Sequence, residues 1–197
     1  MVEIIPSMVA AAAALFAAFM SVWSSQHTEM NKKRSLEIEF RRQQLNDLYG
    51  PIHMKQRTSV ALRGLFPWKN PDGTKWRLVD HIVEIQHQAE PTKLSAVSEI
   101  IRINEEIAEL LTKHFGLYLG FPPPDTLSHY IAHAKLLSLA WREGRNEDSA
   151  NRLPFPDEFD TVIEDAIDTL RNRLGQIGGL PPGMLRRTHL VSSRKSG

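Results

Sequence analysis

Hydrophobic residues recur along most of this chain at three- and four-residue intervals, and no segment shows the period-two alternation of a convincing strand. The clearest example runs from Pro91 to about Phe115. Residues spaced in this way lie on one face of a helix, which predicts a helix with a single buried stripe. The stripe consists of Leu94, Val97, Ile101, Asn104, Ala108 and Leu111. The pattern as a whole predicts an all-α protein.

The boundaries of the other helices follow from proline, glycine and capping residues. Gly50-Pro51 predicts a kink or break, since proline cannot donate a backbone hydrogen bond and disfavours helix in the residue before it. Asp125, after three prolines, is expected to cap the next helix. Helices are thus predicted at about 52–66, within 76–88, at 91–115, at 125–142 and at 157–175, with a loop over 66–75.

The stretch from Ile4 to Gln26 contains no charged residue, and it is almost wholly apolar or small up to Trp23. About 20 helical residues suffice to cross the hydrocarbon core of a bilayer. Trp23 closes the run, where an aromatic ring favours the membrane interface. We therefore predict a single transmembrane anchor. A cleaved signal peptide and an apolar helix in the core of a soluble fold are the alternatives.

Basic residues follow this stretch at Lys32, Lys33, Arg34, Arg41 and Arg42. By the positive-inside rule they predict that the N-terminus lies outside and the bulk of the chain in the cytoplasm. The predicted organisation is a transmembrane anchor at 1–27, a cytosolic helical bundle with a charged juxtamembrane helix at 28–175 and a disordered basic tail at 176–197. The predicted location is the cytoplasmic membrane, and only a resemblance to bacterial proteins, given below, implies that this is the inner membrane of a bacterium.

The composition excludes several classes of function and indicates no specific activity. The formal charge is +1, with 42% hydrophobic and 24% charged residues, which is typical of a globular protein. No overall field attracts nucleic acid, and the basic tail carries no aromatic residues that could stack on bases. The chain has no cysteine, which excludes disulfides, thiolate metal sites and a cysteine nucleophile and fits a reducing compartment.

The sharpest candidate for chemistry is the pair His129 and His133, four residues apart on one predicted helix. Both imidazoles could reach one metal ion, and Asp125 lies one turn earlier on the same side. The pair lacks the glutamate of the HExxH motif. The competing interpretation is that the histidines form hydrogen bonds within the bundle, and we expect no cofactor.

Asn104 interrupts an otherwise apolar stripe. A buried amide needs hydrogen-bond partners, because leaving it unsatisfied costs about 1–3 kcal/mol. His129 or His133 on the neighbouring helix is the expected partner. This buried polar network of Asn104, His129 and His133 would either fix the register of the helices or line a small polar pocket.

Three segments carry a resemblance to a known group: QLNDLYGPIHMKQRTSVALRGLF, EIIRINEEIAELLTKHFGL and PPPDTLSHYIAHAKLL. Together they resemble small, uncharacterised bacterial proteins with an "LYGP" motif, in which a transmembrane helix precedes a charged helix and a helical domain. The similarity covers about Leu36 to Arg142. It implies the anchored, helical architecture and no particular activity, and the alanine-rich span and basic tail depart from it.

These features favour a membrane-anchored helical scaffold or interaction protein over an enzyme. The bundle is expected to present a surface to a protein partner, and the juxtamembrane helix is expected to self-associate through Ile38, Leu45, Leu48 and Ile52. Two alternatives stay open. One is a small metal-dependent enzyme that uses His129 and His133, and the other is a membrane-acting effector that oligomerises through its N-terminal helix.

Overall fold

The structure is a computed structural model that describes the chain except residues 1–3, 68, 74–75, 121, 146–153 and 179–197, and describes side chains from Leu15 onward. The prediction of an all-α protein is confirmed: the described residues form helices and their connections, without a strand. In chain order these are α1 (Ile4–Gln43), η1 (Gln44–Tyr49), α2 (Gly50–Arg63), η2 (Leu78–Asp80), α3 (Ile82–Gln88), α4 (Pro91–Lys113), η3 (Phe115–Leu117), α5 (Asp125–Glu143) and α6 (Phe159–Gly178).

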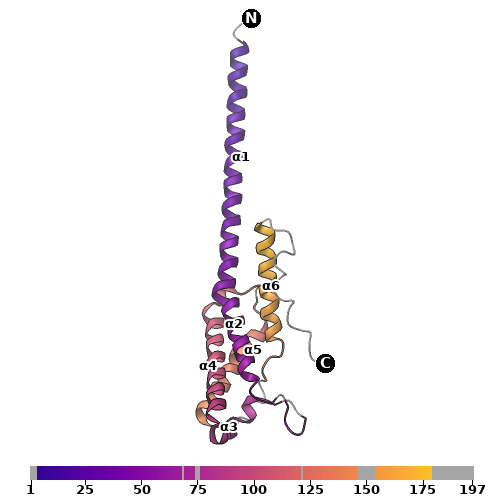
Figure 1. The fold of residues 1–197 in the computed structure, drawn as a ribbon. Coiled ribbons are helices and arrows are strands. Elements are labelled where there is room, and N and C mark those ends of the chain that lie inside the picture. The colour runs from indigo at the N-terminus through magenta and orange to yellow at the C-terminus, as the bar shows by residue number, and fades with distance from the viewer. Residues whose placement is uncertain (1–3, 68, 74–75, 121, 146–153, 179–197) are drawn as a thin grey trace, which may run out of the picture.

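Helix α1 extends far beyond the bundle formed by the other helices (Figure 1). Its C-terminal part lies beside α6, where the Arg34 guanidinium donates a hydrogen bond to the carbonyl of Ile177. The N-terminal half of α1 has no such neighbour in Figure 1, and its described side chains from Leu15 to Met30 are exposed. The fold is therefore a bundle with one long projecting helix.

Of the kink or break predicted at Gly50, the structure shows no break: the helical path continues from α1 through the irregular turn η1 into α2. Gly50 keeps right-handed helical angles, and its N–H donates to the carbonyl of Leu45, five residues earlier. This wider, π-type turn precedes Pro51, which occupies the first turn of α2, where its missing N–H is tolerated. Gln44 secures the turn to the bundle by donating from Nε2 to the carbonyl of Leu117 at 2.9 Å.

Alanine at position 50 is expected to destabilise the fold, although alanine usually favours helix over glycine. A Cβ on Gly50 would lie 2.6 Å from the backbone oxygen of Leu45, and backbone cannot swing aside as a side chain can. We expect Gly50→Ala to lower the free energy of unfolding by about 1–3 kcal/mol in urea denaturation. Gly116→Ala is the control, because nothing lies within 4 Å of its added Cβ. Equal stabilities of the two variants would refute the close approach of Gly50 to the backbone oxygen of Leu45.

The core is organised around α4, which packs against α2, α3 and α5. The predicted stripe on α4 is confirmed: Val97, Ile101, Ala108 and Leu111 are buried together with Asn104. One part of the core joins α4 to η1, α2, α5 and α6, and a second joins it to α3, α5 and the segment after α2. Buried residues of the first part include Leu48, Ile52, Ile107, Tyr130, Phe159 and Leu170.

Self-association through the predicted face of the juxtamembrane helix is contradicted by this packing. Leu48 and Ile52 have no exposed surface because they belong to the core, and Ile38 and Leu45 are half-buried. The three- and four-residue spacing correctly predicts one apolar face on this helix, but that face contacts α4 and α6 of the same chain.

Helix ends differ from prediction at two places. Asp125 is the first residue of α5 and makes no capping hydrogen bond; Pro124 occupies the capping position. Helix α6 begins at Phe159 and continues past Gly175 to Gly178. Most of the predicted basic tail, from residue 179 on, lies outside the described residues.

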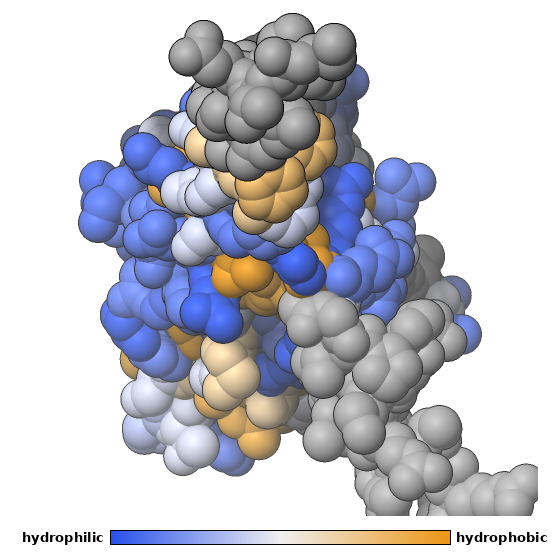
Figure 2. Space-filling model, turned by 90° about the horizontal axis from the view of Figure 1, so that it is seen from above, coloured by the Kyte–Doolittle hydropathy of each residue, from blue (hydrophilic) through white to orange (hydrophobic). Residues whose placement is uncertain are grey.

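No helix among the described residues is both long enough and apolar enough to cross a membrane. The side chains of residues 4–14, which supply much of the predicted anchor, lie outside the described part of the chain. The transmembrane anchor therefore stays a prediction. Figure 2 shows hydrophilic residues over most of the bundle surface visible along the helix axis, with a smaller hydrophobic area below the projecting helix.

Candidate functional site

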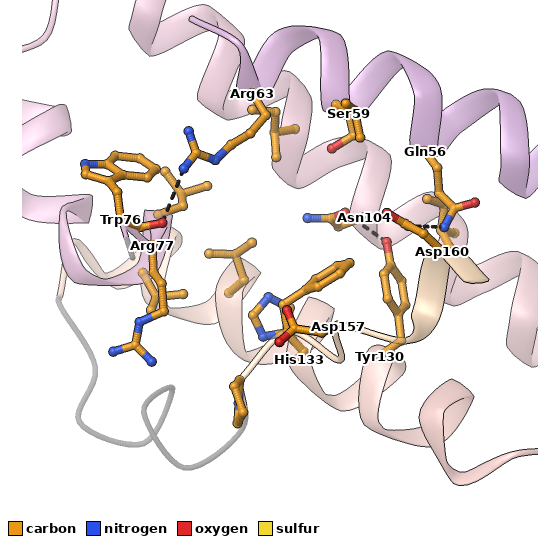
Figure 3. A pocket seen from close by; sticks show the side chains of 18 of the residues that line it. Gln56, Ser59, Arg63, Trp76, Arg77, Asn104, Tyr130, His133, Asp157 and Asp160 are labelled. Carbon is orange, nitrogen blue, oxygen red and sulfur yellow. Dashed lines mark hydrogen bonds between the residues drawn. The ribbon is translucent and has the colours of Figure 1, made fainter. Parts of the chain in front are cut away.

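A cavity of about 780 Å³ lies where α2, α4, α5 and the start of α6 meet the segment that follows α2. Its walls are mainly apolar, and the polar groups enter from several elements, as Figure 3 shows. A concave, mostly apolar pocket with a few convergent polar groups is the usual form of a binding site for a small molecule. The residues that define it here are Gln56, Ser59, Arg63, Trp76, Arg77, Asp80, Ile100, Asn104, Ile107, Tyr130, His133, Leu137, Phe155, Asp157 and Asp160.

The centre of the cavity contains a hydrogen-bonded pair. The hydroxyl of Tyr130 donates to Oδ1 of Asn104 at 2.8 Å, and both side chains are buried. Burial among apolar neighbours, with the negative charge of Asp160 as a smaller cause, raises the pKa of Tyr130 above its ordinary value. The phenol therefore stays protonated at neutral pH and acts as a donor, which fixes the orientation of the Asn104 amide.

At one end of the cavity, Gln56 on α2 donates from Nε2 to Oδ1 of Asp160 on α6 at 2.6 Å. Asp160 is exposed, yet partial burial of its carboxylate raises the pKa, and the nearby charge of Glu164 adds to the effect. The hydrogen bond from Gln56 and the charge of Arg57 act in the opposite direction. Ionised Asp160 is thus less favourable in the folded protein than in the unfolded chain.

Asp160→Asn is expected to raise Tm slightly at pH 7 and to leave it unchanged near pH 3. A carboxyl whose folded pKa is raised costs stability only above its unfolded pKa, so the benefit of a neutral amide appears as pH rises through that range. The asparagine retains an acceptor for Gln56. Thermal unfolding at several pH values measures the effect, with Asp168→Asn, whose side chain is 76% exposed, as the control. A variant less stable than the wild type at pH 7 would contradict the unfavourable charge.

At the other end, Arg63 lies over the Trp76 ring, 4.3 Å from its centroid, and donates to the carbonyls of Pro67 and Trp76. Phe66 and His81 stack against the same indole, with centroids 5.4 and 4.9 Å away. These contacts give the segment after α2 a fixed position in spite of its turn-rich sequence.

The second arginine at this end is paired. Arg77 donates to both carboxylate oxygens of Asp80, at 2.9 and 3.4 Å, and the two charges offset each other. Both arginines at this end of the cavity therefore already form contacts with the protein itself.

Of the two predicted histidines, the structure brings only His133 to the cavity. His133 is buried, and its ring meets the edge of Phe155 at 5.6 Å. His129 and Asp125 are exposed. The buried side of α5 is centred on Tyr130, and a residue one position earlier is turned by about 100° away from it.

The predicted metal site finds no support. Within the described ranges, no three histidine, cysteine, aspartate or glutamate side chains lie close enough together to hold a metal ion. The predicted network is right for Asn104 and wrong for its partner, which is Tyr130 and neither of the histidines. Asn104 was expected either to fix the register of the helices or to line a pocket. In the structure it lies in the contact between α4 and α5 and also at the cavity wall.

Sequence reasoning missed most of the cavity. In the sequence, Tyr130 shows only an aromatic ring at an apolar position of this helix; the signal that could have found it is its hydroxyl, one helix away from a buried asparagine. Arg63, Trp76 and Asp160 come from three separate segments, and only the tertiary fold brings them together. Comparisons of this chain with protein families, with characterised proteins and with solved structures give no match.

Proposed function

We propose that this protein is a helical interaction module held at a membrane by its N-terminal helix. The observation that carries the proposal is α1, a helix from Ile4 to Gln43 whose first half projects away from the bundle (Figure 1). Large apolar side chains there face outward: Leu15 is 73% exposed, Phe19 65% and Trp23 56%.

Such a surface is unfavourable in water. Removing apolar area from water is worth about 25 cal/mol per Å², and contiguous exposed apolar surface usually marks contact with a membrane or another protein. The preceding residues continue the apolar character, since no charged residue occurs from Ile4 to Gln26. A bilayer accounts for this exposed apolar surface best, because lipid can cover the whole circumference of a helix.

The change from apolar to charged sequence in α1 gives the proposed depth and direction. Charged residues begin at Glu29 and include the basic cluster Lys32 to Arg34. Each basic charge near an anionic surface contributes about 1 kcal/mol, so the cluster favours a position at the cytoplasmic headgroups. The bundle then lies just inside the membrane, and its cavity faces the cytoplasm or the space beside the headgroups.

Flotation with lipid vesicles tests this proposal. Full-length protein mixed with phosphatidylcholine vesicles is expected to rise with the lipid in a density gradient, both at low salt and at about 1 M NaCl, where screening is nearly complete. Insertion of apolar side chains resists salt, whereas attraction through the basic cluster alone does not. Protein that stays at the bottom of the gradient at both salt concentrations would overturn the proposal, and flotation only at low salt with anionic lipid would reduce it to a surface contact.

A further inference from the structure

We propose that the cavity between α2, α4, α5 and α6 binds an uncharged, largely apolar organic molecule that carries a hydrogen-bond acceptor of the carbonyl type. The acceptor is held by Nδ2 of Asn104, and the apolar body lies against Ile100, Ile107 and Leu137. This inference goes beyond the membrane attachment and does not depend on it.

Asn104 supplies the argument for an acceptor. Its side chain is only 7% exposed, and its Oδ1 is occupied by the Tyr130 hydroxyl. Nδ2 must then point the other way, and Figure 3 shows the amide nitrogen directed into the open centre of the cavity. Among the described residues no acceptor reaches this nitrogen. A donor that faces an apolar cavity costs free energy unless a partner within the cavity accepts from it.

The charged groups of the cavity argue for a neutral ligand. Arg77 is paired with Asp80, Asp160 accepts from Gln56, and Arg63 donates to two backbone carbonyls. Most of the hydrogen-bonding capacity of these groups is used within the protein, at one end of the cavity or the other (Figure 3), although within the described part of the chain Nη1 of Arg63 is buried without a hydrogen bond. A charged ligand would compete with these contacts, whereas an acceptor at Asn104 adds a hydrogen bond and displaces none.

The size and walls of the cavity fit a molecule with one or two rings. Its volume of about 780 Å³ falls in the range of about 300–1,000 Å³ that is usual for small-molecule sites. Ile100, Ile107 and Leu137 are nearly fully buried and form an apolar floor, while the edge of Phe155 offers an aromatic contact. Apolar area covered by the ligand supplies the affinity, and the Asn104 amide supplies the selectivity.

Photolabelling with benzophenone tests the proposal on the full-length protein. Benzophenone is uncharged and has two rings and one carbonyl. When irradiated, its carbonyl oxygen takes a hydrogen atom from a nearby C–H bond and the two carbon radicals join, so the labelled residue can be found by mass spectrometry of peptides. We expect saturable labelling of cavity residues on α4 and α5. Labelling of α1 is counted separately, because its exposed apolar side chains also attract the probe.

Fluorene, which has the same fused rings as fluorenone without the carbonyl, separates the acceptor from the apolar body. In the wild type it should compete for cavity labelling about tenfold less well than unlabelled fluorenone, a diaryl ketone, because it leaves the Asn104 donor unpaired. In Asn104→Leu, which keeps the volume and removes the donor, the two competitors should become equal. Equal competition in the wild type would overturn the proposed acceptor contact.

Two further variants make the test independent of one substitution. Ser59→Trp places a large ring in the cavity from α2 and should abolish cavity labelling, whereas His129→Ala, on the exposed side of α5, should not. Tyr130→Phe frees the Asn104 amide to rotate and should reduce the preference for the ketone even if Asn104→Leu does not fold. Labelling of α4 and α5 that persists in folded Ser59→Trp, or labelling confined to α1 in the wild type, would overturn the site.

Discussion

Arginine in place of both Phe16 and Phe19 is expected to release the full-length protein from membranes. The two phenylalanines are 66% and 65% exposed on the projecting part of α1. An arginine near the centre of a membrane helix costs about 2.5–3.5 kcal/mol on insertion scales, and each substitution also removes a favourable apolar contribution. The combined penalty exceeds what an alanine-rich span can offset, so the variant should stay at the bottom of a flotation gradient.

The control for this prediction places the same charges outside the apolar run. Arginine in place of Gln26 and Met30 adds equal charge to the same helix, near the basic cluster that begins at Lys32. That variant should float like the wild type, since arginine is favourable at the headgroups. Equal flotation of both double variants would show that α1 does not enter the hydrocarbon core.

Phe159→Ala is expected to produce the largest loss of stability, about 3–5 kcal/mol. Phe159 begins α6 and has no exposed surface. Its ring stacks on Tyr130 with centroids 3.8 Å apart. Truncation leaves a void between α5 and α6 and removes an aromatic pair, so the cost combines lost burial, a cavity and lost stacking. Guanidinium unfolding followed by circular dichroism measures the change.

Phe115→Ala is the matched control, because its ring is 52% exposed and makes an edge-to-face contact with Tyr118 near the protein surface. It should change the free energy of unfolding by less than about 1 kcal/mol. Similar losses in both variants, or an unchanged midpoint in Phe159→Ala, would mean that α6 does not pack on α5 as described.

The helices of the bundle could be predicted from sequence because their apolar spacing reports directly on burial. The stripe on α4 is the clearest case: the positions predicted from spacing are those that pack against α2 and α5. The same spacing on the juxtamembrane helix predicted a sticky face correctly and its partner wrongly. Periodicity shows which face is buried and contains no information on what covers it.

The continuous helix through Gly50 could not be predicted, because proline and glycine are read as local interruptions. The wide turn at Gln44–Tyr49 places Pro51 where its missing N–H has no consequence, and the hydrogen bond from Gln44 to Leu117 stabilises that turn from elsewhere in the chain. Tertiary contacts therefore overrode a local preference.

Two residues of the candidate site, Asn104 and His133, could be singled out from the sequence. Asn104 stood out as an amide within an apolar stripe, and the requirement for a buried partner was correct. The partner was misassigned because histidines were favoured as polar groups, while Tyr130 was counted only for its ring. Arg63, Trp76 and Asp160 carry no pattern in sequence that would group them, since the cavity arises from the packing of separate segments.

The central claim, that α1 fixes the bundle at the cytoplasmic face of a membrane, is tested most directly in spheroplasts, where the outer face of the inner membrane is open to the medium. Full-length protein tagged at both ends is extracted with alkaline carbonate, and separate spheroplasts are treated with protease from outside. The account predicts that the protein stays in the membrane pellet, that the N-terminal tag is removed and that the C-terminal tag is protected. Release of the protein into the carbonate supernatant, with both tags intact, would contradict it.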